Sequence, residues 1–142
     1  MYRSPASSTI RPNDENLNHQ IRMVSTNDTA THILIMGDFN YRNINWKSGI
    51  TSTSLSESSF IDTINDGHLH QHVTNPTRAR ANQCPGVLDL IFTNEENMLS
   101  DLEIMAPLSK SDHAVLSFQL NCYTTFEEVT TIHRQYHKET SQ

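Results

Sequence analysis

The chain has 142 residues, which fits one domain, since domains typically hold about 100–150 residues. Ten basic and sixteen acidic residues give a net charge of −6, which excludes a basic coat that binds nucleic acid by counterion release alone. Two distant cysteines exclude a disulfide framework and a cysteine-rich zinc module. No apolar run suits a signal peptide or a transmembrane segment, so we expect a soluble, intracellular protein of the nucleus or cytoplasm.

The first part of the chain alternates loop, helix and strand patterns. Residues 4–14 are rich in turn formers and predict a loop. Apolar residues at helical spacing predict a helix over residues 15–25, with Asp14 as its N-cap. The continuous apolar run at residues 32–36 is typical of a strand that is buried on both faces and lies centrally in a covered sheet.

The second part continues the alternation. A second helix is expected over residues 57–66, and Gly67 is placed to end it in the left-handed conformation. Further strands are expected at residues 69–73, 87–93, 101–106 and 114–120. Residues 121–142 predict a weakly structured extension with one short helix near residues 126–136. This order of elements indicates the α/β class, with one domain over residues 1–120.

Three segments place an acid or an amide at the end of an expected strand. They are Gly37-Asp38-Phe39-Asn40, Leu88-Asp89-Leu90-Ile91 and Ser111-Asp112-His113. Each segment alone is explained as a turn, because Asp and Asn are common turn formers. Their joint occurrence favours an active site at the strand ends.

Asp89 interrupts an apolar run, where an ionised carboxylate is costly unless a partner compensates for its desolvation. One explanation is a hydrogen-bonded core aspartate. The other is a carboxylate that accepts a proton from a histidine ring and fixes its tautomer, and His113 is the expected partner.

The three segments, in this order and at these spacings, resemble the endonuclease/exonuclease/phosphatase superfamily, and specifically the apurinic-type endonuclease domain of non-LTR retrotransposons. Further matching segments are Tyr2-Arg3-Ser4-Pro5, Asn43-Ile44-Asn45-Trp46 and Asn75-Pro76-Thr77-Arg78. The resemblance covers residues 2–120. It implies a nuclease associated with a reverse transcriptase, with DNA as the substrate.

The resemblance also implies a role for individual side chains. Asp38 would orient or deprotonate the attacking water, and Asn40 would bind a phosphate oxygen. Asp89 would pair with His113, whose ring would contact the scissile phosphate. Tyr2 would contact a phosphate oxygen, and Asp112 would lie on the divalent-metal side of the site.

The implied cofactor is Mg²⁺ or Mn²⁺, which suits a site rich in oxygen ligands and poor in cysteine. In the family, an early Asn and a metal-binding Glu precede the Tyr segment, and this sequence begins at that segment. We therefore expect about half of a four-layer α/β sandwich, weak metal binding without that Glu, and an exposed inner sheet face. Self-association or pairing with the missing N-terminal half would cover this face.

Two other groups of residues have a structural and a functional explanation. His68, His70 and His72 alternate, as in a metal cluster on one strand face, but surface histidines are the preferred interpretation. Arg78 and Arg80 form the best local basic patch and would bind DNA phosphates, or they are solvated loop charges.

The leading hypothesis is a fragment of a Mg²⁺-dependent DNA endonuclease that is weak or inactive alone. The second is a non-catalytic remnant that acts as a binding or oligomerising module. The third keeps the superfamily but changes the substrate to a phospholipid or an inositol phosphate, and the retroelement-like segments at residues 75–78 and 88–94 weigh against it.

Overall fold

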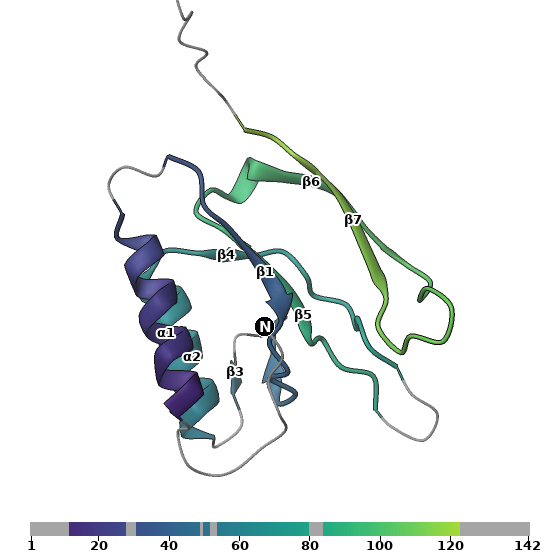
Figure 1. The fold of residues 1–142 in the computed structure, drawn as a ribbon, viewed down its shortest axis with the longest axis horizontal. Helices are drawn as coiled ribbons and strands as arrows, with labels where there is room; N and C mark the ends of the chain where they lie inside the picture. The colour runs from purple at the N-terminus through teal and green to yellow at the C-terminus, as the bar shows by residue number, and fades with distance from the viewer. Residues whose placement is uncertain (1–11, 28–30, 49, 52–53, 80–83, 123–142) are drawn as a thin grey trace, which may run out of the picture.

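The structure is a computed structural model, and it describes residues 12–27, 31–48, 50–51, 54–79 and 84–122. In chain order its elements are α1 (Pro12–Ser25), β1 (Leu34–Asp38), β2 (Ile44–Asn45), β3 (Ile50–Thr51), α2 (Leu55–Asp66), β4 (His70–Gln71), β5 (Asp89–Thr93), the 3-10 turn η1 (Glu96–Met98), β6 (Leu99–Met105) and β7 (Val115–Leu120). Helices and antiparallel sheets are mixed, which is compatible with the expected α/β class. In Figure 1 the two helices lie side by side, the β1–β5–β4 sheet is central, and the long β6–β7 hairpin lies on the other side.

The β1–β5–β4 sheet positions the strands that carry the acidic residues. β5 is its central strand and pairs antiparallel with β1 and with β4. The expectation that the strand at residues 32–36 is central and buried on both faces is wrong, because β1 is the edge strand of the described sheet and Met36 is 63% exposed. The central strand is β5, where Ile91, opposite Met36, is 1% exposed. On the face that carries Met36 and Ile91, the sheet is therefore exposed at β1 and buried at β5.

The first helix starts earlier than its sequence pattern indicated. α1 begins at Pro12, which suits the first turn of a helix because proline lacks the N–H group that is unsatisfied there. Asp14 is therefore not an N-cap. It is buried inside the helix, where its carboxylate accepts a hydrogen bond from Ser56 Oγ of α2. This buried contact joins the two helices.

The end of α2 also differs from the expectation. Gly67 has a φ of −79°, and the left-handed residue is His68, with a φ of 50°. Glycine is required at position 67 for another reason. A Cβ atom there would lie 2.8 Å from Ser25 Oγ and 3.0 Å from Ser25 Cβ, so the missing side chain allows the ends of α1 and α2 to approach closely.

An aromatic core lies between the helices and the sheet. Phe60 of α2 contacts the rings of Phe39 and Phe92, with centroid distances of 5.4 and 5.9 Å, and stacks on Tyr41 at 4.3 Å. Phe39 and Tyr41 directly flank Asn40, so the core side chains anchor the chain on both sides of a polar residue. The turn after β1 is thereby fixed to the rigid part of the fold.

The last two strands form a separate antiparallel hairpin, β6–β7, with an irregularity between Ser100 and Glu103. The strand expected from residue 101 begins at Leu99, directly after η1. The extension expected over residues 121–142 and its short helix fall almost entirely outside the described residues. In the described ranges, no helix has the length and apolar character needed to cross a membrane.

Candidate active site

The turn after β1 holds two of the expected site residues. Asp38 ends β1, and its Oδ1 accepts a hydrogen bond from the backbone N–H of Asn40 at 3.1 Å. Asn40 has a φ of 52°, in the left-handed region that Asn tolerates better than most residues. Asp38 thus stabilises a turn, as the explanation of this segment as a turn requires. Its carboxylate also lies near other charged groups.

Asp38 and Asp89 come together because β1 and β5 are antiparallel. They form the last residue pair of the β1–β5 register, so the end of β1 meets the start of β5. Directly opposed residues in an antiparallel pair project from the same face of the sheet. The pairing continues as Phe39 N–H donates to Leu88 O at 2.9 Å. The two carboxylates therefore lie side by side at the end of the hydrogen-bonded β1–β5 pair.

His113 lies against both carboxylates. Its Nδ1 is 3.0 Å from Asp89 Oδ2 and 3.2 Å from Asp89 Oδ1, so the Asp89–His113 contact expected from the sequence is present. Its Nε2 is 3.9 Å from Asp38 Oδ2 and 4.0 Å from Asp112 Oδ1. A carboxylate can only accept, so Nδ1 carries the hydrogen and Nε2 faces the other two acids. The imidazole is therefore oriented by Asp89.

The electrostatic environment acts most clearly on Asp38. Burial raises the pKa of its carboxyl group above the usual value, and the neighbouring Asp89 carboxylate raises this pKa further. His113, the Asn40 N–H group and Arg78 act in the opposite direction on the same pKa. A carboxylate with a raised pKa is a stronger base, which suits proton abstraction from water.

Asp112 belongs to a second strip of contacts that holds the His113 segment in place. Its Oδ2 accepts a hydrogen bond from Arg78 Nε at 2.6 Å. Backbone bonds accompany this ion pair: Ala79 N–H donates to Asp112 O at 3.2 Å, and Ala114 N–H donates to Thr77 O at 2.7 Å. Arg78, which is expected to bind DNA, is thus paired with Asp112, which is expected on the metal side of the site.

Thr77 is a site-supporting residue that sequence reasoning missed. It is 1% exposed, and its Oγ1 accepts hydrogen bonds from the N–H groups of Leu88 and Asp89, at 3.1 and 3.0 Å. With its carbonyl bonded to Ala114, Thr77 connects the start of β5 to the segment that carries His113. The available signal was the position of Thr77 in the Asn75-Pro76-Thr77-Arg78 segment.

A metal ion needs a set of converging ligands. In residues 12–122, apart from the undescribed gaps, no group of three or more His, Cys, Asp or Glu side chains is arranged to hold one. The chemistry of the donors agrees, because Asp89 is bonded to His113 and Asp112 to Arg78. The described residues alone therefore do not fit a complete magnesium site.

The remaining expected site residues are either undescribed or apart. Tyr2 and Arg80 lie outside the described residues. His68 follows α2 and precedes β4, so the three alternating histidines do not share one strand. His72 is 2.6 Å from Thr93 Oγ1 through its Nε2 atom, and burial lowers the pKa of its imidazole. His70 is exposed.

Comparison with protein families gives one finding. The model of a family described as endonuclease-reverse transcriptase matches residues 1–117, which include Asp38, Asn40, Asp89 and His113. Comparison with curated proteins and with solved structures gives no significant match.

Proposed function

The chain belongs to the endonuclease-reverse transcriptase family, and we propose that its Asp38, Asn40, Asp89 and His113 side chains take part in hydrolysing a phosphodiester bond of DNA. The observation that carries the proposal is the position of the His113 ring. Asp89 holds Nδ1, while Nε2 faces Asp38 at 3.9 Å, so a base and an oriented imidazole meet at one place.

Each side chain then has a separate task. Asp38, with its raised pKa, takes a proton from water as the water oxygen bonds to phosphorus. Protonated His113 donates from Nε2 to the phosphate or the leaving oxygen as the old P–O bond breaks, and Asp89 stabilises the imidazolium. Asn40 Oδ1 accepts from Arg42 Nε at 3.4 Å, which orients the Asn40 amide, and this amide binds a phosphate oxygen.

The cofactor in this proposal is Mg²⁺ or Mn²⁺, with Asp112 on the metal side. Because the described residues do not form a complete site, the proposal requires further ligands, such as the Glu that the resemblance implies. The same reasoning extends to the fold: we propose that residues 1–120 form about half of a four-layer sandwich. The proposal also includes Tyr2 as a contact to a phosphate oxygen and Arg80 as a residue that binds DNA phosphates.

A second candidate function is a non-catalytic binding module of the same family. The observation that favours it is the missing group of metal ligands among the described residues. The two functions differ in what the acidic cluster, Asp38, Asp89 and Asp112 around His113, does: a binding module does not need Asp38, and a nuclease does.

The experiment is a nicking assay on supercoiled plasmid with Mg²⁺. The protein is a fusion in which the earlier part of a family endonuclease, with its Asn and Glu, precedes Met1. The proposal predicts nicking that Asp38→Ala abolishes in a folded protein. Nicking that persists in Asp38→Ala, with folding confirmed by circular dichroism, would show that this cluster is not catalytic.

A further inference from the structure

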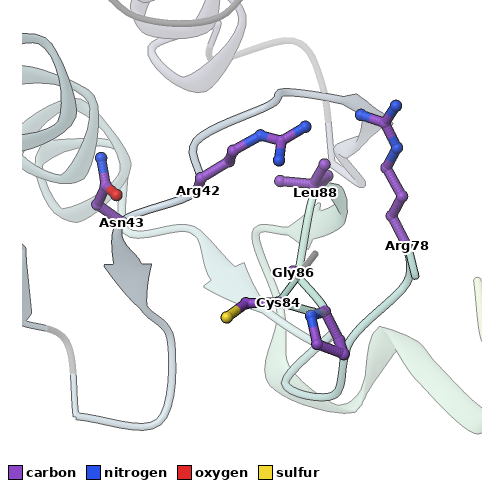
Figure 2. A pocket seen from close by; sticks show the side chains of 7 residues that line it. Arg42, Asn43, Arg78, Cys84, Gly86 and Leu88 are labelled. Atoms are coloured by element: carbon purple, nitrogen blue, oxygen red, sulfur yellow. The ribbon is translucent and has the colours of Figure 1, made fainter. Parts of the chain in front are cut away.

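A cavity of about 340 Å³ lies beside the acidic cluster, near the lower end of the volumes typical of small-ligand sites. It is lined by the chain after β1, through Arg42 and Asn43, by Arg78, and by residues 84–88 leading into β5. Figure 2 shows the Arg42 and Arg78 side chains in the upper part of the view, with Leu88 between them and with Gly86 and Cys84 below. We call this the arginine cavity.

Two basic side chains line the arginine cavity, although the chain as a whole is acidic. Among the described residues that line it are two arginines and no carboxylate, although acidic residues outnumber basic residues by sixteen to ten in the whole sequence. An arginine pair with a gap between its guanidinium groups is suited to an anion with several oxygen atoms, because guanidinium binds phosphate through two parallel hydrogen bonds.

Each arginine is held by a neighbouring polar side chain through its Nε atom. Arg42 Nε donates to Asn40 Oδ1 at 3.4 Å, and Arg78 Nε donates to Asp112 Oδ2 at 2.6 Å. In the described part of the chain, these are the side-chain hydrogen bonds that the two guanidinium groups make. Their terminal NH₂ groups are thus positioned by neighbours and still able to donate to a ligand.

Both arginines are also close in the chain or in the backbone pairing to proposed catalytic residues. Asn40 precedes Arg42 by two residues, and Arg78 forms a backbone bridge with His113. Through this bridge, one lining residue of the cavity lies directly beside the segment that carries His113. A free phosphate ion would use the same arginines but would make no contact with the catalytic group.

We propose that the arginine cavity binds a phosphodiester group of the DNA strand, next to the one at His113, between Arg42 and Arg78. The choice of DNA rests on the proposed function; the preference for an anion rests on the cavity itself. Arg42 is the new assignment here, and its bond to Asn40 couples strand binding to the orientation of the Asn40 amide.

Cys84 offers a direct test, because it lines the cavity and is exposed. The sequence has two cysteines, so Cys122→Ser leaves Cys84 as the single thiol. The rate of N-ethylmaleimide addition to Cys84 is measured in EDTA, with a 20-base-pair duplex, with inorganic phosphate, or with neither. Affinity for the fluorescent duplex is measured by anisotropy at several salt concentrations.

We expect the duplex to slow Cys84 modification severalfold. Arg42→Gln should remove this protection, weaken duplex binding about tenfold and reduce the salt slope by about one. Arg22→Gln, which removes the same charge from the exposed side of α1, is the control and should bind like the parent. Circular dichroism confirms folding of both variants.

The outcomes separate the cavity from the function. The cavity proposal is overturned if Arg42→Gln binds the duplex with full affinity and the duplex does not protect Cys84 in the parent. The proposed function would then remain intact. A parent that does not bind the duplex would overturn the cavity proposal, while the proposed function is tested separately by the nicking assay on the fusion protein. Protection by inorganic phosphate without protection by duplex would overturn the strand assignment and identify a free-anion site instead.

Discussion

Asp38 and Asp89 lie directly opposite each other across β1 and β5, and the His113 ring that is bonded to Asp89 lies 3.9 Å from Asp38. Like charges directly opposite in an antiparallel pair destabilise a sheet. The fold therefore maintains an unfavourable pair at the point where the proposed chemistry occurs. This relationship makes stability and function separable by mutation.

The first prediction concerns pH. The folded-state pKa of Asp38 is raised, so its stabilising contribution is complete below the unfolded pKa of about 3.9 and is lost as pH rises through the folded pKa. We expect Asp38→Asn to raise the free energy of unfolding at pH 7 by about 0.5–1 kcal/mol and to lose that advantage near pH 3. Urea unfolding at both pH values measures the difference in the free energy of unfolding between Asp38→Asn and the parent. Asp62→Asn, on the exposed side of α2, is the control, and an equal gain at both pH values would contradict the account.

The second prediction concerns Thr77. Thr77→Val keeps the side-chain shape but leaves the buried N–H groups of Leu88 and Asp89 without their acceptor. We expect a loss of about 2 kcal/mol or more in the free energy of unfolding. Thr77→Ser, which keeps the hydroxyl, should recover most of it, and the exposed Thr74→Val should have little effect. A Thr77→Val protein as stable as the parent would show that these bonds matter little.

The third prediction concerns the contact between the helix ends. Gly67→Ala places a Cβ atom 2.8 Å from Ser25 Oγ, which forces α1 and α2 apart. We expect a cost of about 1–3 kcal/mol in thermal or urea unfolding. Gly37→Ala is the matched control, because its Cβ would meet Phe39 at 3.8 Å, an ordinary contact distance. If both variants lose the same stability, close helix approach is not the cause.

The fourth prediction concerns the His113 ring and needs no activity. Asp89 accepts from Nδ1, so the neutral ring should carry its hydrogen on Nδ1. Ring ¹⁵N chemical shifts in the labelled protein report this tautomer. Asp89→Ala should shift His113 to the mixture of tautomers found in exposed histidine, while the exposed His70 stays unchanged. A hydrogen on Nε2 in the parent would contradict the expected pairing.

Part of the candidate site could be predicted from the sequence, because two of its residues leave a local signal. Asp89 interrupts an apolar run, and a carboxylate there needs a partner, so the sequence predicts a pairing such as that with His113. The Asp38 turn was readable because Asp and Asn have local turn chemistry.

Other features depend on tertiary structure and give no local signal. Met36 has the sequence pattern of a buried strand, but its exposure is decided by the place of β1 in the sheet order. Asp14 looked like an N-cap, and its partner is Ser56, 42 residues away. The Asp38–Asp89 pairing required the antiparallel register of β1 and β5, and Thr77 acts through a hydroxyl that no periodicity reveals.

The fifth prediction is that the 142-residue chain alone nicks DNA weakly or not at all. The described residues lack a complete ligand group, and Mg²⁺ requires near-octahedral coordination. The measurement is Mg²⁺-dependent nicking of supercoiled plasmid. Robust nicking that Asp38→Ala abolishes would mean that the chain supplies a full site by itself.

The most direct test of the central claim is the nicking rate of the fusion protein with and without the His113 side chain, at saturating Mg²⁺. Because groups that act as a unit lose most of their effect when one is removed, His113→Ala should slow nicking by orders of magnitude, and Asp89→Asn nearly as much. His70→Ala, at an exposed histidine, should keep the parent rate. A folded His113→Ala fusion that nicks DNA at the parent rate would contradict the assignment of His113 to catalysis and favour the non-catalytic binding module.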